Sequence, residues 1–578
     1  MDRLKYLLVI TFLLSYQQII FAQKNSSLSE LNEIDKNINE SIFIATNTNS
    51  FLTGEKLFYK IFCIDKTTKK SSKFNKIAYF ELIDSSKKSI FIHKLFLIDG
   101  CGSGDFFIPT TLESGVYKIV GYTKWMLNKD PDVYFNTDIY ILNPYKEKLS
   151  DITHPEIDSK EIITSEVFNN ANISLDIQKK DFETRNQIEL KIKAKSDDFL
   201  KGNYIISVRK KDGFLSQEKM SFKEPSFMDT SNKIEHSNFI IPELRGEIIT
   251  GRIFSDKQDV KNKKITISII GKSSYLKIAN TDEQGKFIFN LEKYIPNSNI
   301  VIQILEDNKQ DYSIEIDPIN KINSSKLSFS NFKFNLASAQ NIRERLISSQ
   351  IENAYYTLKK DSLIESKDTI PFLGLKSTEF KLDAYTRFPT IEETITEVIS
   401  GVVFRKDANN YSLHVYDYNE NYESTLSPLV VVDGLILEEL NDFFTYNPKN
   451  IYKVNVIRGL YYFGPKLFNG IIYFTTKNGN YETKLNGNFI IKPHLIRPEG
   501  KKKYFQPDYS NNQNTRIPDY RHQLLWIPNV NLTQKDTTVN FYTSDVTGSF
   551  EIILEGFSAN GNPVFIKETF KVKNTVSN

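Results

Sequence analysis

Short runs in which apolar and polar residues alternate dominate this chain. An alternation with a period of two places every second side chain on the buried face of an antiparallel sheet. The clearest examples are the sets Ile265, Ile267 and Ile269, then Phe287, Phe289 and Leu291, and finally Phe550, Ile552 and Leu554. Turn-forming residues separate such runs along most of the chain. The pattern predicts a mainly β protein.

A helical pattern is clearest between residues 338 and 360. Apolar residues recur there at spacings of three to five, at Ala339, Ile342, Leu346, Ile351, Ala354 and Leu358. This spacing puts the side chains on one face of a helix. We therefore expect a helix that packs modules together, followed by a linker to residue 380. A shorter helix is expected at Ile391–Ile399.

The first module is predicted at residues 40–145. The expected strands are Ser41–Ala45, Lys56–Ile64, Ile77–Ile83, Ser89–Leu97, Gly104–Ile108 and Gly115–Trp125. Their spacing is typical of an antiparallel sandwich. The passage Gly102–Met126 reads G-S-G-D-F-F-I-P-T-T-L-E-S-G-V-Y-K-I-V-G-Y-T-K-W-M. It resembles the macroglobulin-type, Ig-like sandwich of exported bacterial proteins, and the resemblance implies that fold here.

The chain has two cysteines, Cys63 and Cys101. Cys63 shares a strand face with Tyr59 and Ile61, so we expect its thiol to point into the core. Macroglobulin-type proteins carry a thioester in a G-C-G-E-Q motif, where the Gln three residues after the Cys supplies the acyl group. Here that position is Gly104, so no thioester is expected. Exported domains often contain disulfides, and the sequence leaves a Cys63–Cys101 disulfide and two buried thiols equally open.

Two further modules follow. A polar stretch leads to a second sandwich-like module at 172–240, with expected strands Ile173–Ile177, Gln187–Ala194 and Tyr204–Lys210. A third module, at 243–318, contains I-T-G-R-I-F-S-D, K-I-T-I-S-I-I-G and A-N-T-D-E-Q-G-K-F-I-F-N-L. These passages are similar to the carboxypeptidase regulatory-like domain, a small transthyretin-like sandwich. That domain is non-catalytic in its namesake enzymes, so the resemblance implies no peptidase.

Residues 381–482 hold three β-rich runs, Leu429–Val432, Ile451–Ile457 and Ile471–Thr475. The pairs Asp433-Gly434, Arg458-Gly459 and Asn469-Gly470 separate them and predict tight turns. We place Asp433, Gly434, Gly459, Gly464 and Gly470 in turns, and expect positive φ at Gly434 and Gly470. The order of the pieces resembles the plug domain of TonB-dependent outer-membrane receptors, a small α+β domain.

A receptor barrel would need many further strands. Only about a hundred residues follow Thr476, so we expect a plug-like module without a barrel of its own. Its surface should either bind a separate barrel or be covered by neighbouring modules, with the 338–360 helix and the C-terminal hairpin as the expected covers. That hairpin lies in residues 486–575, where Asn560-Gly561 is a hairpin signal. Tyr520–Pro528 and Phe541–Gly556 resemble the terminal sandwich that follows the plug-like unit in the same exported family, so a separate C-terminal sandwich is expected.

Residues 1–22 have the pattern of a secretory signal peptide. Arg3 and Lys5 precede the apolar segment Leu7–Leu14, and Ile20-Phe21-Ala22 is a suitable cleavage site. We expect the mature chain to begin near Gln23. No later run reaches the roughly eighteen apolar residues of a membrane-spanning helix, so no transmembrane segment is expected after cleavage.

Charge and candidate chemistry narrow the function further. The balance of 74 basic against 71 acidic residues gives no argument for a nucleic-acid partner. No two of the six histidines lie within five residues of each other, so no zinc pair is expected. Neither a G-x-S-x-G nucleophile motif nor a phosphate-binding glycine-rich loop occurs. We therefore expect no catalytic, cofactor or metal site, and no enzyme.

Together these features predict an exported protein of a Gram-negative cell envelope. It would associate with the outer membrane on a side that the sequence leaves open. We expect it to dock on, scaffold or gate an outer-membrane β-barrel complex through protein contacts such as β-strand addition. The alternative is a surface adhesin or glycan-binding protein built of sandwich modules, and a hydrolase is a third class.

Treatment of the folded protein with methylamine is expected to leave its mass unchanged, because Cys101 lacks the Gln that a thioester requires. Mass spectrometry of the intact protein measures this. A gain equal to the mass of one methylamine would contradict the prediction.

Overall fold

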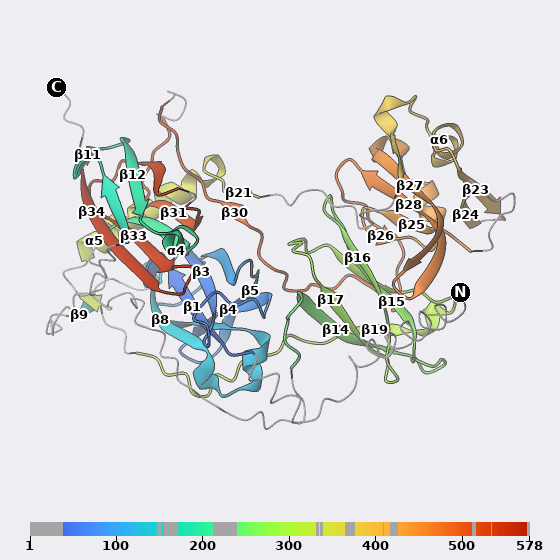
Figure 1. Cartoon of the computed structure of the whole chain (residues 1–578), viewed down its shortest axis with the longest axis horizontal. Coiled ribbons are helices and arrows are strands. Elements are labelled where there is room, and N and C mark those ends of the chain that lie inside the picture. Colours follow the sequence, from blue (N-terminus) through green and yellow to red (C-terminus); the bar gives the residue numbers. More distant parts are fainter. Residues whose placement is uncertain are drawn as a thin grey trace, which may run out of the picture.

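The computed structural model describes residues 38–146, 153–154, 172–211, 240–330, 334–335, 339–364, 376–408, 410–416, 426–510, 516–532 and 534–574. The expected signal peptide lies outside these residues. Figure 1 shows two lobes. The sandwich lobe contains the strands between residues 40 and 210, the helix α5 and the strands after residue 502. The plug lobe contains residues 247–316 and 376–491. The chain is mainly β, as the alternating pattern predicted.

The first sandwich of the sandwich lobe has two sheets, with strand orders β1-β3-β6 and β2-β8-β7-β4-β5. Its strands are β1 (Glu40–Thr46), β2 (Ser50–Leu52), β3 (Lys56–Asp65), β4 (Ile77–Asp84), β5 (Ser89–Phe96), β6 (Cys101–Phe107), β7 (Gly115–Tyr122) and β8 (Phe135–Leu142). Leu57, Tyr59 and Ile61 of β3 point into the core between these sheets, while Phe58 and Phe62 of the same strand point the other way. Both faces of β3 are therefore covered.

The second sandwich is built from two parts of the chain that lie far apart in sequence. Its sheets have the orders β10-β12-β32 and β11-β34-β33-β13-β31. The early strands are β10 (Ile173–Ile177), β11 (Asp181–Glu183), β12 (Gln187–Ala194) and β13 (Asn203–Lys210), with the one-turn helix α4 (Asp197–Leu200). The late strands are β31 (Gln523–Val530), β32 (Asp536–Tyr542), β33 (Gly548–Phe557) and β34 (Pro563–Lys573).

This arrangement corrects the expected division into domains. The sequence predicted separate sandwiches at 172–240 and 486–575, but β13 pairs with both β31 and β33, and β12 pairs with β32. Each part contributes strands to both sheets, and together they enclose one core. The hairpin expected around Asn560-Gly561 is present as β33 and β34.

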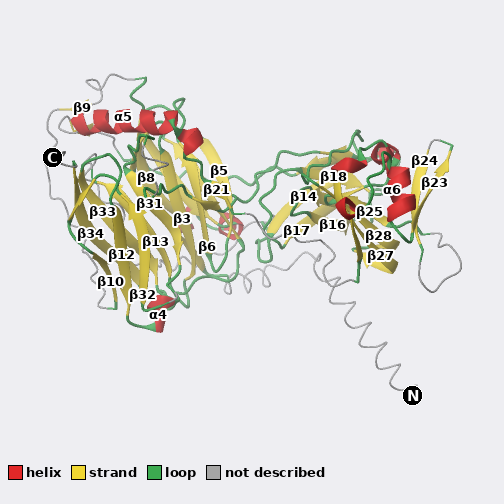
Figure 2. Cartoon of the chain, turned by 90° about the horizontal axis from the view of Figure 1, so that it is seen from above, coloured by secondary structure: helices red, strands yellow, loops and turns green. Residues whose placement is uncertain are grey.

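The two sandwiches stack face to face. Phe43, Phe62 and Cys101 of the first meet Ile205, Trp526, Phe557 and Phe565 of the second in one buried cluster. Four sheets thus lie in layers, and the two inner sheets are buried on both faces. Figure 2 shows α5 (Ala339–Ala354) lying across one end of these layers. Two short pairings complete the lobe, β9 (Thr153–His154) with β20 (Phe334–Asn335) and β21 (Ser362–Leu363) with β30 (Lys502–Lys503).

The plug lobe begins with a small sandwich. One sheet has the order β17-β14-β19 and the other β16-β15-β18-β29. The strands are β14 (Glu247–Phe254), β15 (Lys264–Ile269), β16 (Tyr275–Asn280), β17 (Lys286–Leu291), β18 (Ile300–Ile304), β19 (Ser313–Ile316) and β29 (Ile490–Ile491). The alternating isoleucines of β15 and phenylalanines of β17 are buried, as their period of two predicted.

A second unit of the plug lobe has a five-stranded sheet with the order β22-β27-β28-β25-β26 and a hairpin, β23-β24. The strands are β22 (Thr378–Lys381), β23 (Val402–Asp407), β24 (Asn410–Val415), β25 (Leu429–Val432), β26 (Leu435–Ile436), β27 (Ile451–Phe463) and β28 (Lys466–Thr476). Its helices are α6 (Ile391–Val398), which confirms the shorter expected helix, and α7 (Asn441–Phe444). We call the five-stranded sheet the plug sheet.

Both faces of the plug sheet are covered, but the expected covers were wrong. Val431, Ile471 and Tyr473 pack against Leu276 and Ile278 of the small sandwich. The opposite face packs with residues of α6 and α7. Helix α5 and the C-terminal hairpin instead belong to the sandwich lobe. Arg345 pairs α5 with Glu55 of the first sandwich, and the apolar residues of the hairpin lie in the core of the second.

Buried ions join the two lobes. Glu247 of β14 is 1% exposed, and its carboxylate accepts a hydrogen bond from Lys94 of the first sandwich at 2.7 Å and another from Arg497. Next to it, Glu243 accepts a hydrogen bond from Tyr79 at 2.9 Å. Burial lowers the pKa of Arg497, and the charge of Glu247 partly offsets that effect. Removal of one partner from such a cluster leaves an uncompensated buried charge.

We predict that Glu247→Ala destabilises the protein by about 3–5 kcal/mol, because Lys94 and Arg497 lose the carboxylate that they share. Urea unfolding followed by circular dichroism measures the change.

The matched control is Glu283→Ala, which removes a carboxylate from an exposed ion pair with Lys261 and should change nothing measurable. Equal urea midpoints for Glu247→Ala and the unaltered protein would contradict the role given to Glu247.

Candidate functional site

The turn predicted at Asp433-Gly434 joins β25 to β26. Asp433 has φ of 50° and Gly434 has φ of 97°. The Asp433 carboxylate is fully buried and accepts hydrogen bonds from the Thr476 amide at 2.8 Å, the Thr476 hydroxyl at 2.5 Å and the Tyr481 amide at 3.1 Å. Burial raises its pKa, and these hydrogen bonds reduce the shift. The side chain fixes the end of β28 against the turn and offers nothing to a ligand.

Of the other three glycines predicted to lie in turns, only Gly464 does so. Gly464, with φ of 58°, and Pro465 form the real turn between β27 and β28, since a type II′ hairpin needs positive φ at its first central residue. Gly459 and Gly470 lie within β27 and β28, so their assignment to turns was wrong. The positive φ expected at Gly470 is confirmed at 86°. A Cβ there would lie 2.8 Å from the Ile457 carbonyl oxygen, so the two strands need glycine.

The two cysteines are free and buried, and the possible disulfide is not formed. Cys63, on β3, faces the core of the first sandwich as predicted. Cys101 pairs in register with Phe62 on the neighbouring strand, so its thiol faces the second sandwich. The thiols therefore lie on opposite faces of one sheet, which no disulfide geometry permits. Burial raises the pKa of both thiols and makes them weak nucleophiles.

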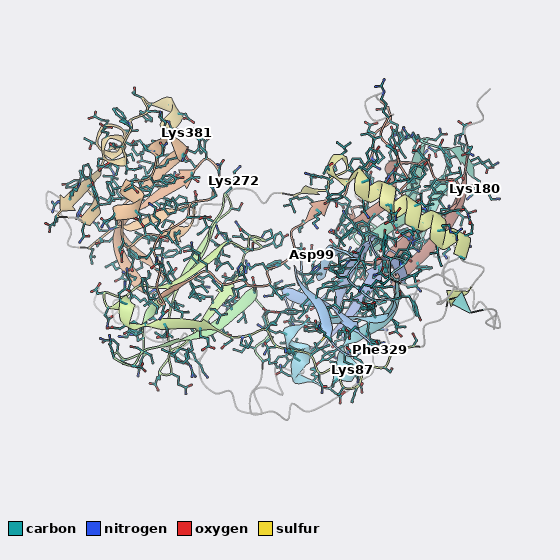
Figure 3. The ribbon with its side chains drawn as sticks, turned by 180° about the vertical axis from the view of Figure 1, so that it is seen from behind. Lys87, Asp99, Lys180, Lys272, Phe329 and Lys381 are labelled. Atoms are coloured by element: carbon teal, nitrogen blue, oxygen red, sulfur yellow. The ribbon has the colours of Figure 1, made fainter. Side chains whose placement is uncertain are left out.

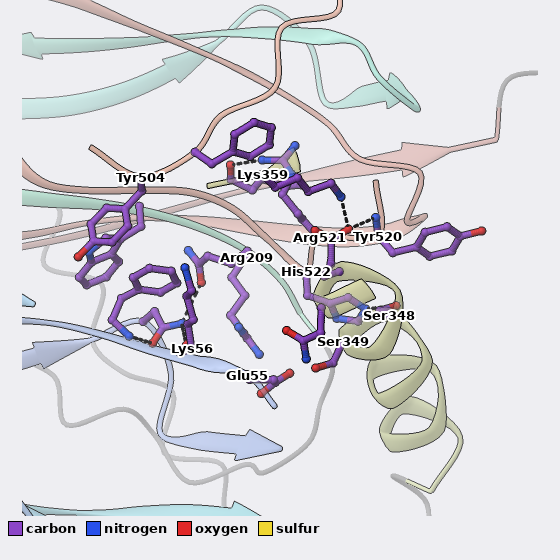
Figure 4. Close-up of a pocket in the computed structure, with 18 of the residues that line it drawn as sticks. Glu55, Lys56, Arg209, Ser348, Ser349, Lys359, Tyr504, Tyr520, Arg521 and His522 are labelled. Carbon is purple, nitrogen blue, oxygen red and sulfur yellow. Dashed lines mark hydrogen bonds and ion pairs between the residues drawn. The ribbon is translucent and has the colours of Figure 1, made fainter. Parts of the chain in front are cut away.

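A cavity of about 190 Å³ lies where three parts of the sandwich lobe meet (Figure 4). The first sandwich contributes the segment from Gly54 to Phe58, and α5 with the turn after it contributes residues from Arg345 to Asp361. The second sandwich contributes Arg209 and the residues from Tyr520 to Trp526. We call it the junction cavity. Sequence reasoning did not find it, because it forms only when distant segments meet.

Helix α5 is held in the junction cavity by an arginine that is 1% exposed. Nε and Nη2 of Arg345 each donate to a different oxygen of Glu55 at 2.6 Å. Nη2 also donates to the Ser50 carbonyl at 2.7 Å. This two-pronged pairing fixes both the position and the rotation of the helix, because a planar guanidinium must face the carboxylate edge on.

Two further ion pairs extend the same contact. Lys56 lies 2.5 Å from Asp361, whose other oxygen accepts a hydrogen bond from the Phe505 amide at 2.9 Å. Glu352 of α5 accepts hydrogen bonds from Lys359 and from the Tyr520 amide, both at 2.7 Å. Burial raises the pKa of Glu352 even though Lys359 opposes the shift. Helix, strand and loop are thus tied by charge-assisted hydrogen bonds.

Ser348 and His522 form a contact in this cavity that resembles a catalytic pair. The hydroxyl of Ser348 lies 3.2 Å from Nε2 of His522, although the residues are 174 positions apart in sequence. A hydroxyl beside an imidazole is the usual start of a nucleophile–base pair. Both side chains are buried, at 6% and 8% exposure, and Ser348 lies inside a regular helix. This contact packs α5 against the segment before β31.

Aromatic rings close the opposite side of the cavity. The ring of Phe58 lies 4.9 Å from that of Tyr504, edge to face, and 5.8 Å from that of Trp526. In the described parts of the chain, no group of three His, Cys, Asp or Glu side chains could hold a metal ion. The cavity therefore brings together paired ions and packed rings from three parts of the chain. Its arrangement suits a structural junction.

We predict that Arg345→Ala lowers the free energy of unfolding by about 3 kcal/mol or more, because Glu55 loses its buried partner. Hydrogen exchange in α5 should rise as the helix loosens, and mass spectrometry measures it.

The control is Arg343→Ala on the same helix, where the side chain is exposed. Equal protection of α5 in both variants would show that the Arg345–Glu55 pair does not hold the helix.

Comparisons with known proteins leave the family open. No protein-family model and no curated protein matches the sequence. No helix in the described residues has the length and apolar character to cross a bilayer.

Among solved structures, a Salmonella alpha-2-macroglobulin reacted with methylamine has a TM-score of 0.23 and 8% identity over 93% of this chain and 40% of its own. An Escherichia coli alpha-2-macroglobulin activated by porcine elastase has a TM-score of 0.24 and 10% identity over 93% of this chain and 44% of its own. This chain thus spans less than half the length of these proteins. At such values the likeness assigns neither a family nor an activity.

Proposed function

We propose that this protein is a non-enzymatic component of the Gram-negative cell envelope that docks on an outer-membrane β-barrel complex. The motif resemblances support this proposal, because macroglobulin-type, regulatory-like and plug-like modules occur together in exported envelope proteins. The plug sheet supports it further. Its two faces are covered within the plug lobe, so any contact that it makes with a partner must use an edge.

The observation that carries the proposal is an open stretch of β27. The edge strand β22 pairs only with residues 453–456 of β27. Beyond that point β27 continues to Phe463, paired with β28 on one side. No other described strand lies along its outer side. An unpaired strand edge is a template for pairing with another chain.

The backbone groups of this edge point outward at alternate residues. The pair Phe463 and Lys466 flanks a two-residue turn, so these two residues bond to each other. Because the pattern alternates, Tyr462 and Leu460 direct their N–H and C=O groups away from β28. Their side chains are 71% and 66% exposed. A strand added here could bond to the outward N–H and C=O groups of Leu460 and Tyr462 and contact their two large side chains.

The partner suited to this edge is an extended segment of the barrel complex. A closed barrel has no free strand edge of its own, so a loop or terminal segment would supply the added strand. Strand addition gains affinity from main-chain hydrogen bonds and specificity from alternate side chains. The exposed tyrosine and leucine would provide that specificity.

We predict that Tyr462→Pro abolishes association with the barrel complex, because proline removes an outward N–H without removing a bond to β28. Copurification from detergent-solubilised outer membranes, followed by identification of any barrel protein, measures the association.

The matched variant Tyr462→Val keeps the N–H and a strand-forming side chain, and should retain part of the binding. If Tyr462→Pro still copurifies with the barrel at the level of the unaltered protein, this edge is not the docking element.

A further inference from the structure

A second hollow, of about 660 Å³, opens on the plug lobe at the other end of β27. Lys381 on β22 and Lys453 on β27 line it, together with Lys477 after β28 and Lys272 from the loop between β15 and β16. Glu379, Asp383, Tyr452, Tyr473, Thr475 and Thr476 complete the lining. We call it the lysine cleft. Figure 3 labels Lys272 and Lys381, which lie on the same side of the plug lobe although they come from different units.

Positive charge exceeds negative charge in the lysine cleft, with four lysines against two carboxylates. Glu379 lies 2.8 Å from Lys453 and 3.8 Å from Lys381. Asp383 lies 3.6 Å from Lys477 and also pairs with Arg387 just outside the cleft. Each carboxylate is therefore shared by two cations. Among the described residues, no carboxylate forms an ion pair with Lys272.

The pKa values of the two carboxylates are both lowered, as expected where positive charge exceeds negative charge. The hydrogen bond from Lys453 lowers the pKa of Glu379, and the one from Arg387 lowers the pKa of Asp383. Both groups stay ionised down to acidic pH, and the cations around them still outnumber them. The cleft thus has a net positive charge at neutral pH, which favours an anionic ligand.

A β-bulge brings an aromatic ring to the same place. The register of β27 with β28 shifts between Ile451 and Lys453, so Tyr452 is the extra residue. A bulge re-aims a side chain that regular alternation would turn to the other face. Tyr452 lines the cleft beside Lys453 and is 41% exposed. An exposed ring next to cations offers an apolar surface and charge together.

We propose that the lysine cleft binds an acidic oligosaccharide, a short glycan whose sugars carry phosphate, sulfate or carboxylate groups. Lysine ammonium groups would pair with the anionic substituents, and the Tyr452 ring would stack on the apolar face of a sugar. The hydroxyl of Thr475 would bond a sugar hydroxyl. The volume is far larger than one inorganic anion needs, and it suits a ligand of a few sugar units. This inference does not depend on docking at the open edge of β27.

The test is calorimetric titration of the full-length protein with a sulfated, heparin-derived tetrasaccharide at low ionic strength. A neutral tetrasaccharide, cellotetraose, and inorganic sulfate are titrated alongside. The sulfated tetrasaccharide should bind at least about tenfold more tightly than either, because charge-assisted hydrogen bonds and ring stacking act together only on that ligand. Its affinity should fall as salt is added.

Variants separate the cleft from general surface charge. Lys272→Gln with Lys381→Gln should weaken binding about tenfold or more, while Lys453 still pairs with Glu379 and preserves the fold. The control pair Lys286→Gln and Lys449→Gln removes two exposed lysines outside the cleft and should leave the affinity unchanged. Tyr452→Ala should weaken binding, and Tyr452→Phe should retain it because the ring remains.

Three outcomes would overturn the proposal. Equal affinities for cellotetraose and the sulfated tetrasaccharide would show that the cleft does not recognise charge. Equal affinities for inorganic sulfate and the sulfated tetrasaccharide would show that the cleft does not recognise the sugar. An equal loss in the cleft variant and the control variant would show non-specific attraction to a basic surface. The titration contains no envelope partner, so its result and that of the docking experiment are independent.

Discussion

The pairing of β13 with β31 and β33 holds together two segments of the chain that are more than three hundred residues apart. It joins residues 203–210 to residues 523–557 and makes one sandwich from the two ends of a long insertion. The entropic cost of closing so long a loop grows only slowly with its length, by about 0.6 kcal/mol for each doubling. A buried sandwich core with two covered sheets readily offsets that cost. The part of the chain between β13 and β31, which includes the plug lobe, must therefore begin and end at the second sandwich.

Buried ion pairs decide how the inserted parts are placed. Glu247 ties the small sandwich to the first sandwich through Lys94, and Arg497 shares the same carboxylate. Arg345 ties α5 to the same sandwich through Glu55. Buried ion pairs contribute little net stability, because desolvation costs nearly as much as the attraction gains. Their geometry is selective, however, and a helix or strand that arrived elsewhere would leave a buried charge unpaired. These pairs thus position modules whose apolar faces alone would permit several arrangements.

Two β-bulges divide β27 into segments with different surroundings. The bulge at Tyr452 turns a ring toward the lysine cleft, and the bulge at Gly459 follows the point where β22 ends. Beyond Gly459 the strand continues as half of a hairpin whose outer edge is open. Because β27 runs the length of the plug sheet, one strand carries the lysine-lined cleft at one end and an open strand edge at the other. The two proposed contacts can therefore be made at once by different molecules.

Local features could be predicted from the sequence, because they depend on neighbouring residues. Alternation at Ile265–Ile269 predicted a half-buried strand, helical spacing predicted α5, and the glycine at position 470 predicted a backbone with positive φ. It could not distinguish a turn glycine from a bulge glycine at 459 and 470, since both require the same local freedom.

Other features depend on contacts between distant segments and could not be predicted from local sequence. Whether residues 172–210 and 523–573 form two sandwiches or one depends on contacts across hundreds of residues, and each part has the same alternating pattern in either case. The separation of Cys63 from Cys101 depends on which face of a doubly covered sheet each thiol meets. The junction cavity and the lysine cleft gather residues from several elements, so their chemistry exists only after packing. Local sequence sets the backbone preference and burial of each segment. Which distant segments pack together depends on the complementarity of their shapes and charges.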